Sequence, residues 1–484
     1  MYRLVLYYLL VLLAWALALS FVGIVPFSPE SLVFSAALIA AACWFANIIF
    51  SWASGAPTNV ESVWITALIL ALITSPVSSG SVSGIAFLLY VSAWAMASKY
   101  ILAPGKKHIF NPAAFGVALA SLTAGESATW WVAGNLWLLP VVFVGGVLIV
   151  RKLRRADLVW SFAAVVLTLT ALTAQGGNWL VPIVATLEHS AFFFLAFVML
   201  TEPLTMPPGR TLRVMYGALV GLLFIPAAHI GSFYFTPELA LLAGNLFAWA
   251  VSPKGRFMFK LVERKKLGTG VWEFAFATAS PMRFKPGQYL EWTLPHQNSD
   301  SRGNRRYFTI ASSPTEGEVR MGIKFYEPMS SFKRALARMQ AGDIISASHL
   351  SGDFVLPRNP NKKLVFIAGG IGATPFRSMV QYLLDRGERR DVDLFYAARN
   401  RAELAYQDIF DRAAAELGVR VNYQIGDEGG RVSPELIKAQ VPDYRERTFY
   451  ISGPRGMVEE FKAALRAAGV SRWKIKTDYF PGFA

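Results

Sequence analysis

The sequence contains a single cysteine, Cys43, among 484 residues. One thiol excludes a disulfide within the chain, a zinc site built from cysteines and an iron–sulfur cluster held by four thiolates. Charged residues are also scarce, at 16%, whereas about 25% is usual for a soluble chain. Hydrophobic residues reach 54%, so the chain is too apolar to be wholly soluble or mainly disordered.

The charge that is present lies mostly in the second half. Residues 1–250 hold 10 Lys and Arg and 7 Asp and Glu, whereas residues 251–484 hold 37 and 25. This division indicates a membrane domain followed by a soluble one. The net charge of +15 does not indicate nucleic-acid binding, because the basic residues are dispersed and membrane topology accounts for many of them.

Long apolar runs fill the first half. A spanning helix needs roughly 20 apolar residues, and we predict an all-α bundle of ten transmembrane helices. The predicted spans lie near residues 4–25, 31–53, 62–76, 83–103, 111–124, 136–151, 157–174, 183–201, 212–229 and 237–252. Lys and Arg fall at alternate ends of these spans, which places both termini in the cytoplasm. We therefore expect a multi-pass protein of the inner (cytoplasmic) membrane, with the lipid bilayer as a partner.

Two polar breaks interrupt the apolar runs on the predicted cytoplasmic side. They are Asn-Pro-Ala-Ala at 111–114 and Thr-Glu-Pro at 201–203. Asn and Pro suit a helix start, so either break alone is explained as a helix end. Together with the topology, the breaks resemble the membrane subunits RnfD and NqrB of the Rnf and sodium-pumping NADH:quinone reductase complexes, over about residues 30–252. That family has Asp where this chain has Glu202.

The resemblance implies FMN or another flavin in the membrane half. The family attaches FMN to the threonine of a Ser/Thr-Gly-Ala-Thr motif, of which this chain keeps Ser-Ala-Thr at 127–129. Thr129 is therefore the candidate for covalent attachment. Two alternatives stay open: a noncovalent flavin, and an outer loop that only anchors Trp130 and Trp131 at the membrane interface.

The second half alternates strand-like and helix-like stretches. Five short β-rich runs between residues 271 and 350 predict an antiparallel β-barrel. Strands near 363–368, 392–396, 419–424, 448–451 and 474–477 then alternate with helices, which predicts a doubly wound α/β domain with a parallel sheet. The expected fold is multi-domain, with a transmembrane domain over 1–253, the β-barrel over 254–358 and the α/β domain over 359–484.

A cation, an aromatic ring and a hydroxyl lie together in one strand-like run. Arg306, Phe308 and Thr309 suit a flavin's phosphate, its isoalloxazine ring and its N5 atom. Ser330 and Ser331 open a helix, whose first N–H groups suit a pyrophosphate. The run resembles the Arg-x-Tyr-Ser-x-x-Ser motif of the ferredoxin–NADP reductase family, with Phe in place of Tyr and Thr in place of the first Ser.

A glycine-rich turn follows the predicted strand near 363–368. Gly-Gly-Ile-Gly-Ala-Thr-Pro at 369–375 lets the backbone approach a dinucleotide pyrophosphate, and it resembles the family's nicotinamide-nucleotide loop. The run at 452–457 resembles the family's Cys-Gly-Pro-x-x-Met loop, with Ser452 replacing the cysteine near the hydride-transfer carbon. Arg399 and Arg401 follow strand 392–396 and favour NADPH over NADH.

The resemblance implies FAD and NAD(P)H as cofactors, with catalytic roles for Thr309 and Ser452 and no metal site. The predicted cofactor-binding residues are Arg306, Tyr307, Phe308, Thr309, Ser312, Ser330, Ser331, Gly369, Gly370, Gly372, Thr374, Pro375, Arg399, Arg401, Gly453, Pro454, Met457, Phe483 and Thr129.

We predict a flavin oxidoreductase that passes electrons from cytoplasmic NAD(P)H through FAD into or across the membrane. The acceptor is a membrane flavin, a quinone or a redox partner protein. Two other functions stay open. One is an NAD(P)H:quinone oxidoreductase that keeps electrons at the cytoplasmic face, and the other is a transporter with a redox-sensing reductase domain.

Overall fold

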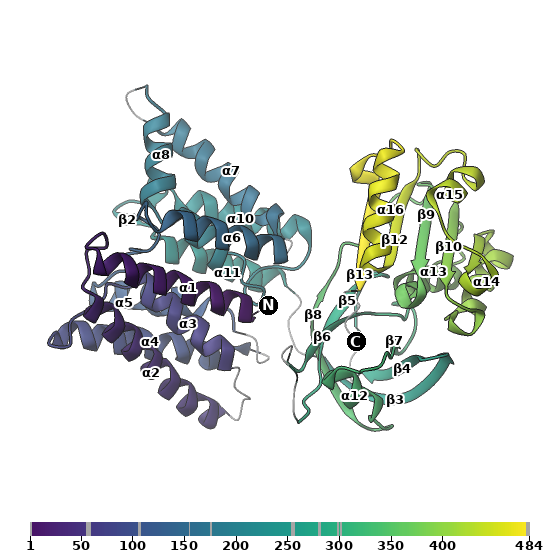
Figure 1. Cartoon of the computed structure of the whole chain (residues 1–484), viewed down its shortest axis with the longest axis horizontal. Helices are drawn as coiled ribbons and strands as arrows, with labels where there is room; N and C mark the ends of the chain where they lie inside the picture. Colours follow the sequence, from purple (N-terminus) through teal and green to yellow (C-terminus); the bar gives the residue numbers. More distant parts are fainter. Residues whose placement is uncertain are drawn as a thin grey trace. The chain divides into compact units, whose positions relative to one another are not determined.

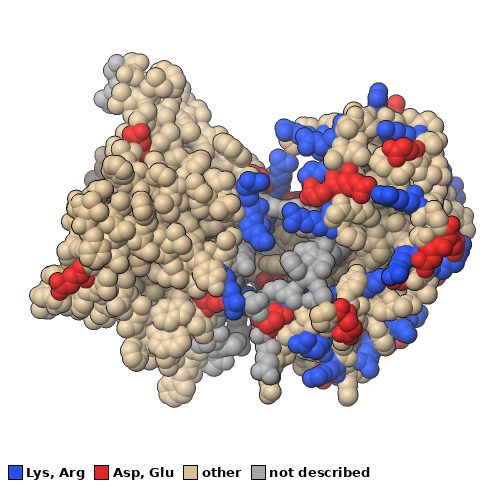
Figure 2. Space-filling view, in the orientation of Figure 1, with Lys and Arg blue, Asp and Glu red and all other residues tan. Residues whose placement is uncertain are grey.

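The computed structural model describes residues 2–54, 60–104, 108–153, 155–174, 177–252, 257–278, 282–297, 300 and 303–480. They belong to two compact units, Met1–Gly255 and Arg256–Ala484, whose elements are labelled in Figure 1. Each unit has hydrophobic cores of its own. Figure 2 shows many charged side chains over the C-terminal unit and few over the N-terminal unit.

The N-terminal unit is built from helices. Their bounds are α1 Tyr2–Phe21, α2 Pro29–Ser54, α3 Val60–Ile73, α4 Val82–Ile101, α5 Pro112–Ala124, α6 Leu139–Leu153, α7 Ala156–Leu172, α8 Leu180–His189, α9 Phe192–Phe194, α10 Arg210–Phe224 and α11 Pro237–Val251. A π-helix at Leu195–Met199 continues α9. A small hairpin of β1 (His229–Ile230) and β2 (Phe233–Tyr234) precedes α11.

Fewer of these helices are long enough to cross a membrane than the sequence predicts. Within the described residues, α1, α2 and α4 are long and apolar enough, and α8 with the α9–π-helix segment is a fourth if that pair, bent by 64°, counts as one span. The prediction of ten full spans is therefore wrong. The helices α3, α5, α7 and α11 have 14, 13, 17 and 15 residues, which is about 20–26 Å of helix against about 30 Å of hydrocarbon.

Large apolar side chains nevertheless face outward on this unit. The buried residues of α2 follow one stripe along the helix, while its Phe45 and Trp52 are 66% and 85% exposed. Trp160 and Leu172 of α7 are exposed to a similar degree. A helix that is apolar on its outer face as well as its inner face suits an apolar surrounding rather than water.

Small residues bring α7 and α10 close together. A Cβ atom at Gly217 of α10 would lie 2.6 Å from the carbonyl oxygen of Leu158, and one at Gly221 would lie 2.9 Å from that of Phe162. Glycines four residues apart are a common contact between helices in lipid, where close backbone packing replaces the hydrophobic effect. The helix pair is also joined by a salt bridge between the largely buried side chains of Asp157 and Arg213, at 2.7 Å.

The C-terminal unit begins with a six-stranded antiparallel sheet. Its strands are β3 Phe257–Gly268, β4 Val271–Thr278, β5 Tyr289–Thr293, β6 Arg305–Thr309, β7 Val319–Lys324 and β8 Ile344–Ser351. They pair in the order β6-β5-β8-β3-β4-β7. Strand pairing among the described residues ends at β6 and β7. One backbone hydrogen bond, from Ala311 just after β6 to Arg320 of β7 at 2.7 Å, joins these two edges, but no ladder closes the sheet into the barrel that the sequence predicts. The sequence analysis missed β3, because the charged residues 263–266 hide its apolar alternation.

The second sheet is parallel. Its strands are β9 Leu364–Gly369, β10 Val392–Ala398, β11 Arg420–Ile425, β12 Thr448–Pro454 and β13 Ile475–Phe480, in the order β11-β10-β9-β12-β13. The helices are α13 Thr374–Arg386, α14 Gln407–Leu417, α15 Pro434–Gln440 and α16 Arg455–Ala467.

Helices cover both faces of this parallel sheet. Along β9, Leu364 and Phe366 pack into a core with α13 and α14, whereas Val365 and Ile367 pack into a second core with α15 and α16. A strand with both faces buried is apolar at every position, not at alternate ones. The prediction of a doubly wound parallel sheet is confirmed.

An ionic cluster holds the start of β12. Arg447 is buried and lies 2.9, 2.9 and 2.7 Å from carboxylate oxygens of Asp391, Asp393 and Asp443. The hydrogen bond from Arg447 lowers the pKa of Asp443 to about 2.

We expect Asp443→Asn to lower the thermal unfolding midpoint of the C-terminal unit at neutral pH. Because the folded-state pKa of Asp443 is depressed, its stabilisation is present above the unfolded pKa of about 3.9 and is lost as the pH falls toward about 2. The deficit should therefore shrink in melting curves of the full chain recorded below about pH 4. Glu446→Gln, at an exposed partner of Lys363, is the control. A deficit that is the same at every pH would contradict this account.

Candidate functional site

Strand β6 presents a cation and an aromatic ring on one face. Side chains two residues apart share a face of a strand, and Arg306 and Phe308 both meet the ring of Phe332. The Arg306 guanidinium carbon lies 5.5 Å and the Phe308 ring 5.8 Å from the centre of that ring. On the other face, Thr309 is buried and Tyr307 is half exposed.

The carboxylate of Asp300 lies beside Arg306 and shows that an anion can be bound there. Arg306 donates two hydrogen bonds to Asp300, at 3.0 and 3.2 Å. The same carboxylate accepts from the backbone N–H of Ser331, at 3.2 Å, where helix α12 (Ser331–Ala337) begins. Ser330 caps that helix with its side chain. A negatively charged group therefore fits between Arg306 and the start of α12, as a flavin phosphate requires.

The two nucleotide loops meet at backbone distance. A Cβ atom at Gly372 would lie 2.3 Å from the carbonyl oxygen of Ser452 and 2.7 Å from the Cα of Gly453. One at Gly369 would lie 2.6 Å from the sulfur of Met457. At Gly372 the neighbouring atoms are backbone, so a larger residue there would push the two loops apart. At Gly369 the nearest atoms belong to the end of the flexible Met457 side chain, which can move aside.

Three further predicted residues belong to the same edge of the sheet. The hydroxyl of Ser452 is buried and has no hydrogen-bond partner among the described residues. Thr374 and Pro375 open α13, and the Thr374 hydroxyl donates to the carbonyl of Ile371 at 3.1 Å. A buried hydroxyl without a protein partner is expected to meet a ligand or water, so Ser452 fits a nucleotide site.

A buried ion pair joins the segment after β6 to helix α13. Arg377 of α13 donates to Glu316 at 2.9 Å and to the carbonyl of Ala311 at 3.2 Å. The hydroxyl of Ser378 donates to the carbonyl of Ser312 at 2.6 Å. Burial lowers the pKa of Arg377, but Glu316 outweighs this and the pKa is raised, so the guanidinium stays charged.

These contacts hold the end of β6 and the start of α13 in one site. The sequence analysis missed Arg377, although a lone cation among the buried residues of α13 was the signal for it. It also missed Asp300, for which no local pattern exists.

The two arginines after β10 have different surroundings. Arg401 donates to both carboxylate oxygens of Glu428, at 2.6 and 2.9 Å. Arg399 is exposed, and within the described part of the chain no salt bridge holds its guanidinium. The local sequence does not reveal this partner of Arg401, because Glu428 follows β11 and only the parallel pairing of β10 with β11 brings it there. Phe483 lies outside the described residues.

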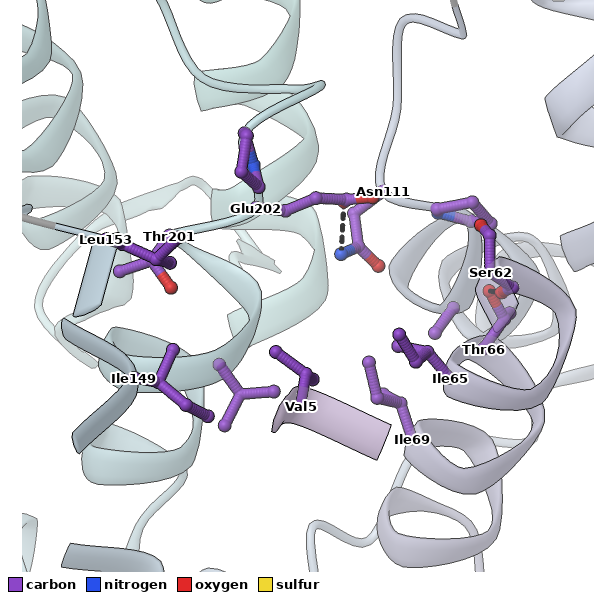
Figure 3. Close-up of a pocket in the computed structure, with 14 residues that line it drawn as sticks. Val5, Ser62, Ile65, Thr66, Ile69, Asn111, Ile149, Leu153, Thr201 and Glu202 are labelled. Carbon is purple, nitrogen blue, oxygen red and sulfur yellow. Dashed lines mark hydrogen bonds between the residues drawn. The ribbon is translucent and has the colours of Figure 1, made fainter. Parts of the chain in front are cut away.

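In the N-terminal unit, the two polar breaks meet at one carboxylate. The side-chain amide of Asn111 donates to Glu202 at 2.8 Å, as Figure 3 shows. The hydroxyl of Thr205 donates to the same oxygen at 3.2 Å, and the Nε2 atom of His108 lies 3.6 Å from the other one. The backbone N–H of Asn111 donates to the side chain of Asn245 at 2.8 Å.

A cavity of about 50 Å³ lies beside this cluster. It is lined by Val5, Ser62, Ile65, Thr66, Ile69, Asn111, Pro112, Ala113, Ile149, Leu153, Val198, Thr201, Glu202 and Pro203. Figure 3 shows Glu202 and Asn111 on one side and the apolar Val5, Ile69 and Ile149 on the other. The cavity is therefore polar on one side and apolar on the other.

Thr129 lies elsewhere, in an exposed loop. The backbone N–H groups of Thr129 and Trp130 both donate to the carbonyl of Ile73, at 2.9 and 3.0 Å. The indole of Trp131 donates to the carbonyl of Thr74 at 3.0 Å. The loop is thus held by its backbone and its tryptophans, while Thr129 stays accessible at the surface. It does not line the cavity beside Glu202.

Comparison with known proteins bears on the C-terminal unit. The family model of the oxidoreductase NAD-binding domain matches residues 366–463. The chain is 27% identical over 239 residues to a flavohemoprotein of Pseudomonas putida, covering 47% of this chain and 59% of the relative. It is 29% identical over 205 residues to an NADPH oxidoreductase of Mycobacterium tuberculosis, covering 41% and 52%.

The C-terminal unit is a ferredoxin–NADP reductase-like module that binds FAD and NAD(P)H. It is an NAD(P)H-dependent flavin oxidoreductase module. Among solved structures, the FAD/NAD-binding domain of nitric oxide dioxygenase from Vibrio cholerae aligns with a TM-score of 0.42 and 20% identity, over 46% of this chain and 98% of that one. The chain spans about half the length of the curated relatives it matches, at 59%, 52% and 52%.

We expect Arg306→Ala to lose FAD. The substitution removes a charge-assisted contact worth about 1.5–3 kcal/mol, which corresponds to a roughly 10- to 100-fold weaker Kd. Flavin absorbance per chain after gel filtration measures the loss. Arg305→Ala removes the neighbouring cation on the opposite face and should keep FAD. Full FAD occupancy in Arg306→Ala would show that the phosphate lies elsewhere.

We expect Arg399 to decide the preference for NADPH over NADH. Arg399→Ala should lower kcat/KM for NADPH by about tenfold, the effect of roughly one charge-assisted hydrogen bond, and leave NADH oxidation unchanged. Arg401→Ala should have a smaller effect, because Glu428 already neutralises Arg401. Steady-state kinetics with both nucleotides checks this. Equal kcat/KM for the two nucleotides in the wild type, unchanged in Arg399→Ala, would refute the preference.

Proposed function

We propose that the whole protein is a membrane-bound flavoprotein, which takes electrons from NAD(P)H in its C-terminal module and delivers them to an acceptor at its N-terminal unit. The observation that carries this proposal is the meeting of Asn111 and Glu202 beside a cavity. These residues come from two breaks 91 positions apart in an otherwise apolar unit. Polar groups that converge inside an apolar unit mark a functional site by default.

The residues of the C-terminal module have separate tasks. Arg306 and the start of α12 hold the FAD phosphate, and Phe308 packs beside the flavin. Ser452 offers a buried hydroxyl without a protein partner among the described residues, while Thr309 lies on the face of β6 opposite Phe308. The loop that contains Gly369 lets the protein backbone approach the nucleotide pyrophosphate. When bound, FAD takes a hydride from NAD(P)H and releases the electrons singly or in pairs.

The N-terminal unit supports a membrane location in three ways. Among its described residues, three helices, or four with the bent pair, are long and apolar enough to span. Its outer surface carries large apolar side chains, Trp52 and Trp160 among them. Its Lys and Arg residues cluster at alternate helix ends, which supports cytoplasmic termini and a place in the cytoplasmic membrane. The resemblance to RnfD and NqrB belongs to this proposal.

The cavity narrows the choice of acceptor. Its volume of about 50 Å³ is well below the roughly 300 Å³ of a small ligand pocket, so the cavity by itself does not hold a flavin ring. One remaining place for a membrane flavin is FMN on Thr129, in the predicted outer loop. Electrons cross about 30 Å of hydrocarbon to reach that side, which needs an intermediate carrier. We therefore propose a quinone, or a redox partner protein, as the nearer acceptor.

Assays with two electron acceptors distinguish this function from the two alternative functions. Ferricyanide is water-soluble and draws electrons from the exposed flavin module, whereas a long-chain quinone partitions into the bilayer. For the full chain in liposomes, we expect Arg306→Ala to abolish both NAD(P)H-dependent reductions. Asn111→Ala should slow only quinone reduction, by about tenfold or more, because it removes a buried hydrogen bond to a charged group, typically worth about 1.5–3 kcal/mol.

The rivals predict different results. A reductase that works only at the cytoplasmic face would reduce quinone equally well with Asn111→Ala. A transporter with a redox-sensing domain would not reduce quinone at all. Ser121→Ala, at an exposed hydroxyl on the opposite end of α5 from Asn111, is the control for damage to that helix.

A further inference from the structure

Glu202 is held by donors from separate parts of the N-terminal unit. Asn111 and Thr205 donate to its Oε2 atom, and His108 faces its Oε1 atom at 3.6 Å. The Nε2 atom of His108 is buried and makes no hydrogen bond within the described residues. Two groups that can both carry a proton, Glu202 and His108, therefore lie side by side with one ring nitrogen uncommitted.

The other titratable groups that act on Glu202 come from two helices. Lys99 of α4 and Tyr216 of α10 both interact electrostatically with its carboxylate. The Lys99 ammonium donates to the carbonyl and hydroxyl oxygens of Ser62, at 3.0 and 3.2 Å. Ser62 in turn lines the cavity, so a positive charge lies behind the cavity wall near Glu202.

Two hydroxyls of the cavity wall already donate to backbone carbonyls. The hydroxyl of Thr66 donates to the carbonyl of Ser62 at 2.9 Å, and that of Thr201 donates to the carbonyl of Phe197 at 2.7 Å. Each hydroxyl has one proton, so both keep lone pairs that can accept a hydrogen bond. A quinone ring is too large for a cavity of about 50 Å³. Water does suit it, because about 50 Å³ exceeds the roughly 10–15 Å³ that one water requires.

We infer that Glu202 is a proton-transfer residue, which passes protons from His108 through water in the cavity to the acceptor as that acceptor is reduced. The inference rests on the proposed function. Reduction of a quinone to a quinol takes up two electrons and two protons. The electrons would come from NAD(P)H through the C-terminal module. Electron transfer by itself does not deliver the two protons of the quinol, and Glu202 with its cavity supplies an entry for them.

The test uses Glu202→Gln in the full chain in liposomes, since Gln keeps the shape and the acceptor for Asn111. We expect ferricyanide reduction and FAD content to match wild type, while quinone reduction falls by about 100-fold or more, the lower end of general acid–base effects. In wild type, the quinone rate should depend on pH, because each turnover takes up two protons. In Glu202→Gln, the slow rate should be nearly independent of pH. Glu202→Asp should restore part of the rate.

A second readout does not depend on turnover. Infrared difference spectra between oxidised and reduced protein should show a carboxylic-acid band that Glu202→Gln removes and His108→Asn shifts. Glu188→Gln is the matched control, because Glu188 also faces a histidine, His189 at 3.9 Å, but both side chains are exposed.

The outcomes are distinct. Wild-type quinone rate, pH profile and infrared band in Glu202→Gln would overturn the proton-transfer role and leave the proposed function standing. The same loss in Glu188→Gln as in Glu202→Gln would also overturn it. Absence of quinone reduction in the wild-type chain would overturn the quinone as the acceptor and this inference with it.

Discussion

Leaving a buried polar group without a hydrogen-bond partner costs more free energy than most single contacts contribute. This constraint determines which segments meet at the candidate site of each unit. In the N-terminal unit, Asn111 and Glu202 satisfy each other across 91 residues. In the C-terminal unit, Arg377 and Glu316 do the same between a loop and a helix. Each pair ties together segments that carry the chemistry, so the sites follow from the need to partner what is buried.

In the N-terminal unit, the close fit between helices determines how they pack. Its helices are apolar on both inner and outer faces, so apolar burial alone does not determine which faces meet. Gly217 and Gly221 allow α7 and α10 to approach closely, and the Asp157–Arg213 pair fixes their register. The polar cluster around Glu202 has the same consequence for the two breaks. The cluster is therefore both a constraint on helix packing and the feature that carries the proposed function.

In the C-terminal module, the burial of apolar side chains away from water determines the packing of the helices on the parallel sheet. Alternation along β9 buries one set of side chains under α13 and α14 and the other set under α15 and α16, which leaves the carboxyl ends of the strands as the open edge. Ligands of doubly wound sheets bind at that edge. The glycine loop after β9 and the Ser452 loop at the end of β12 meet there, and the Arg377 and Ser378 contacts bring the end of β6 to the same place.

Local sequence pattern was sufficient to predict much of the fold of the C-terminal unit. The apolar strand before the glycine-rich turn predicted the parallel sheet, and the spacing of Arg306 and Phe308 predicted their common face, because period and backbone freedom are properties of a few neighbouring residues. The number of spanning helices was wrong, because apolar composition continues past the point where Pro and polar breaks end a helix. The partners of the site residues were decided by tertiary structure. Asp300 on Arg306, Glu428 on Arg401 and Asn111 on Glu202 are contacts between different elements, and only the packing of those elements determines which charge meets which.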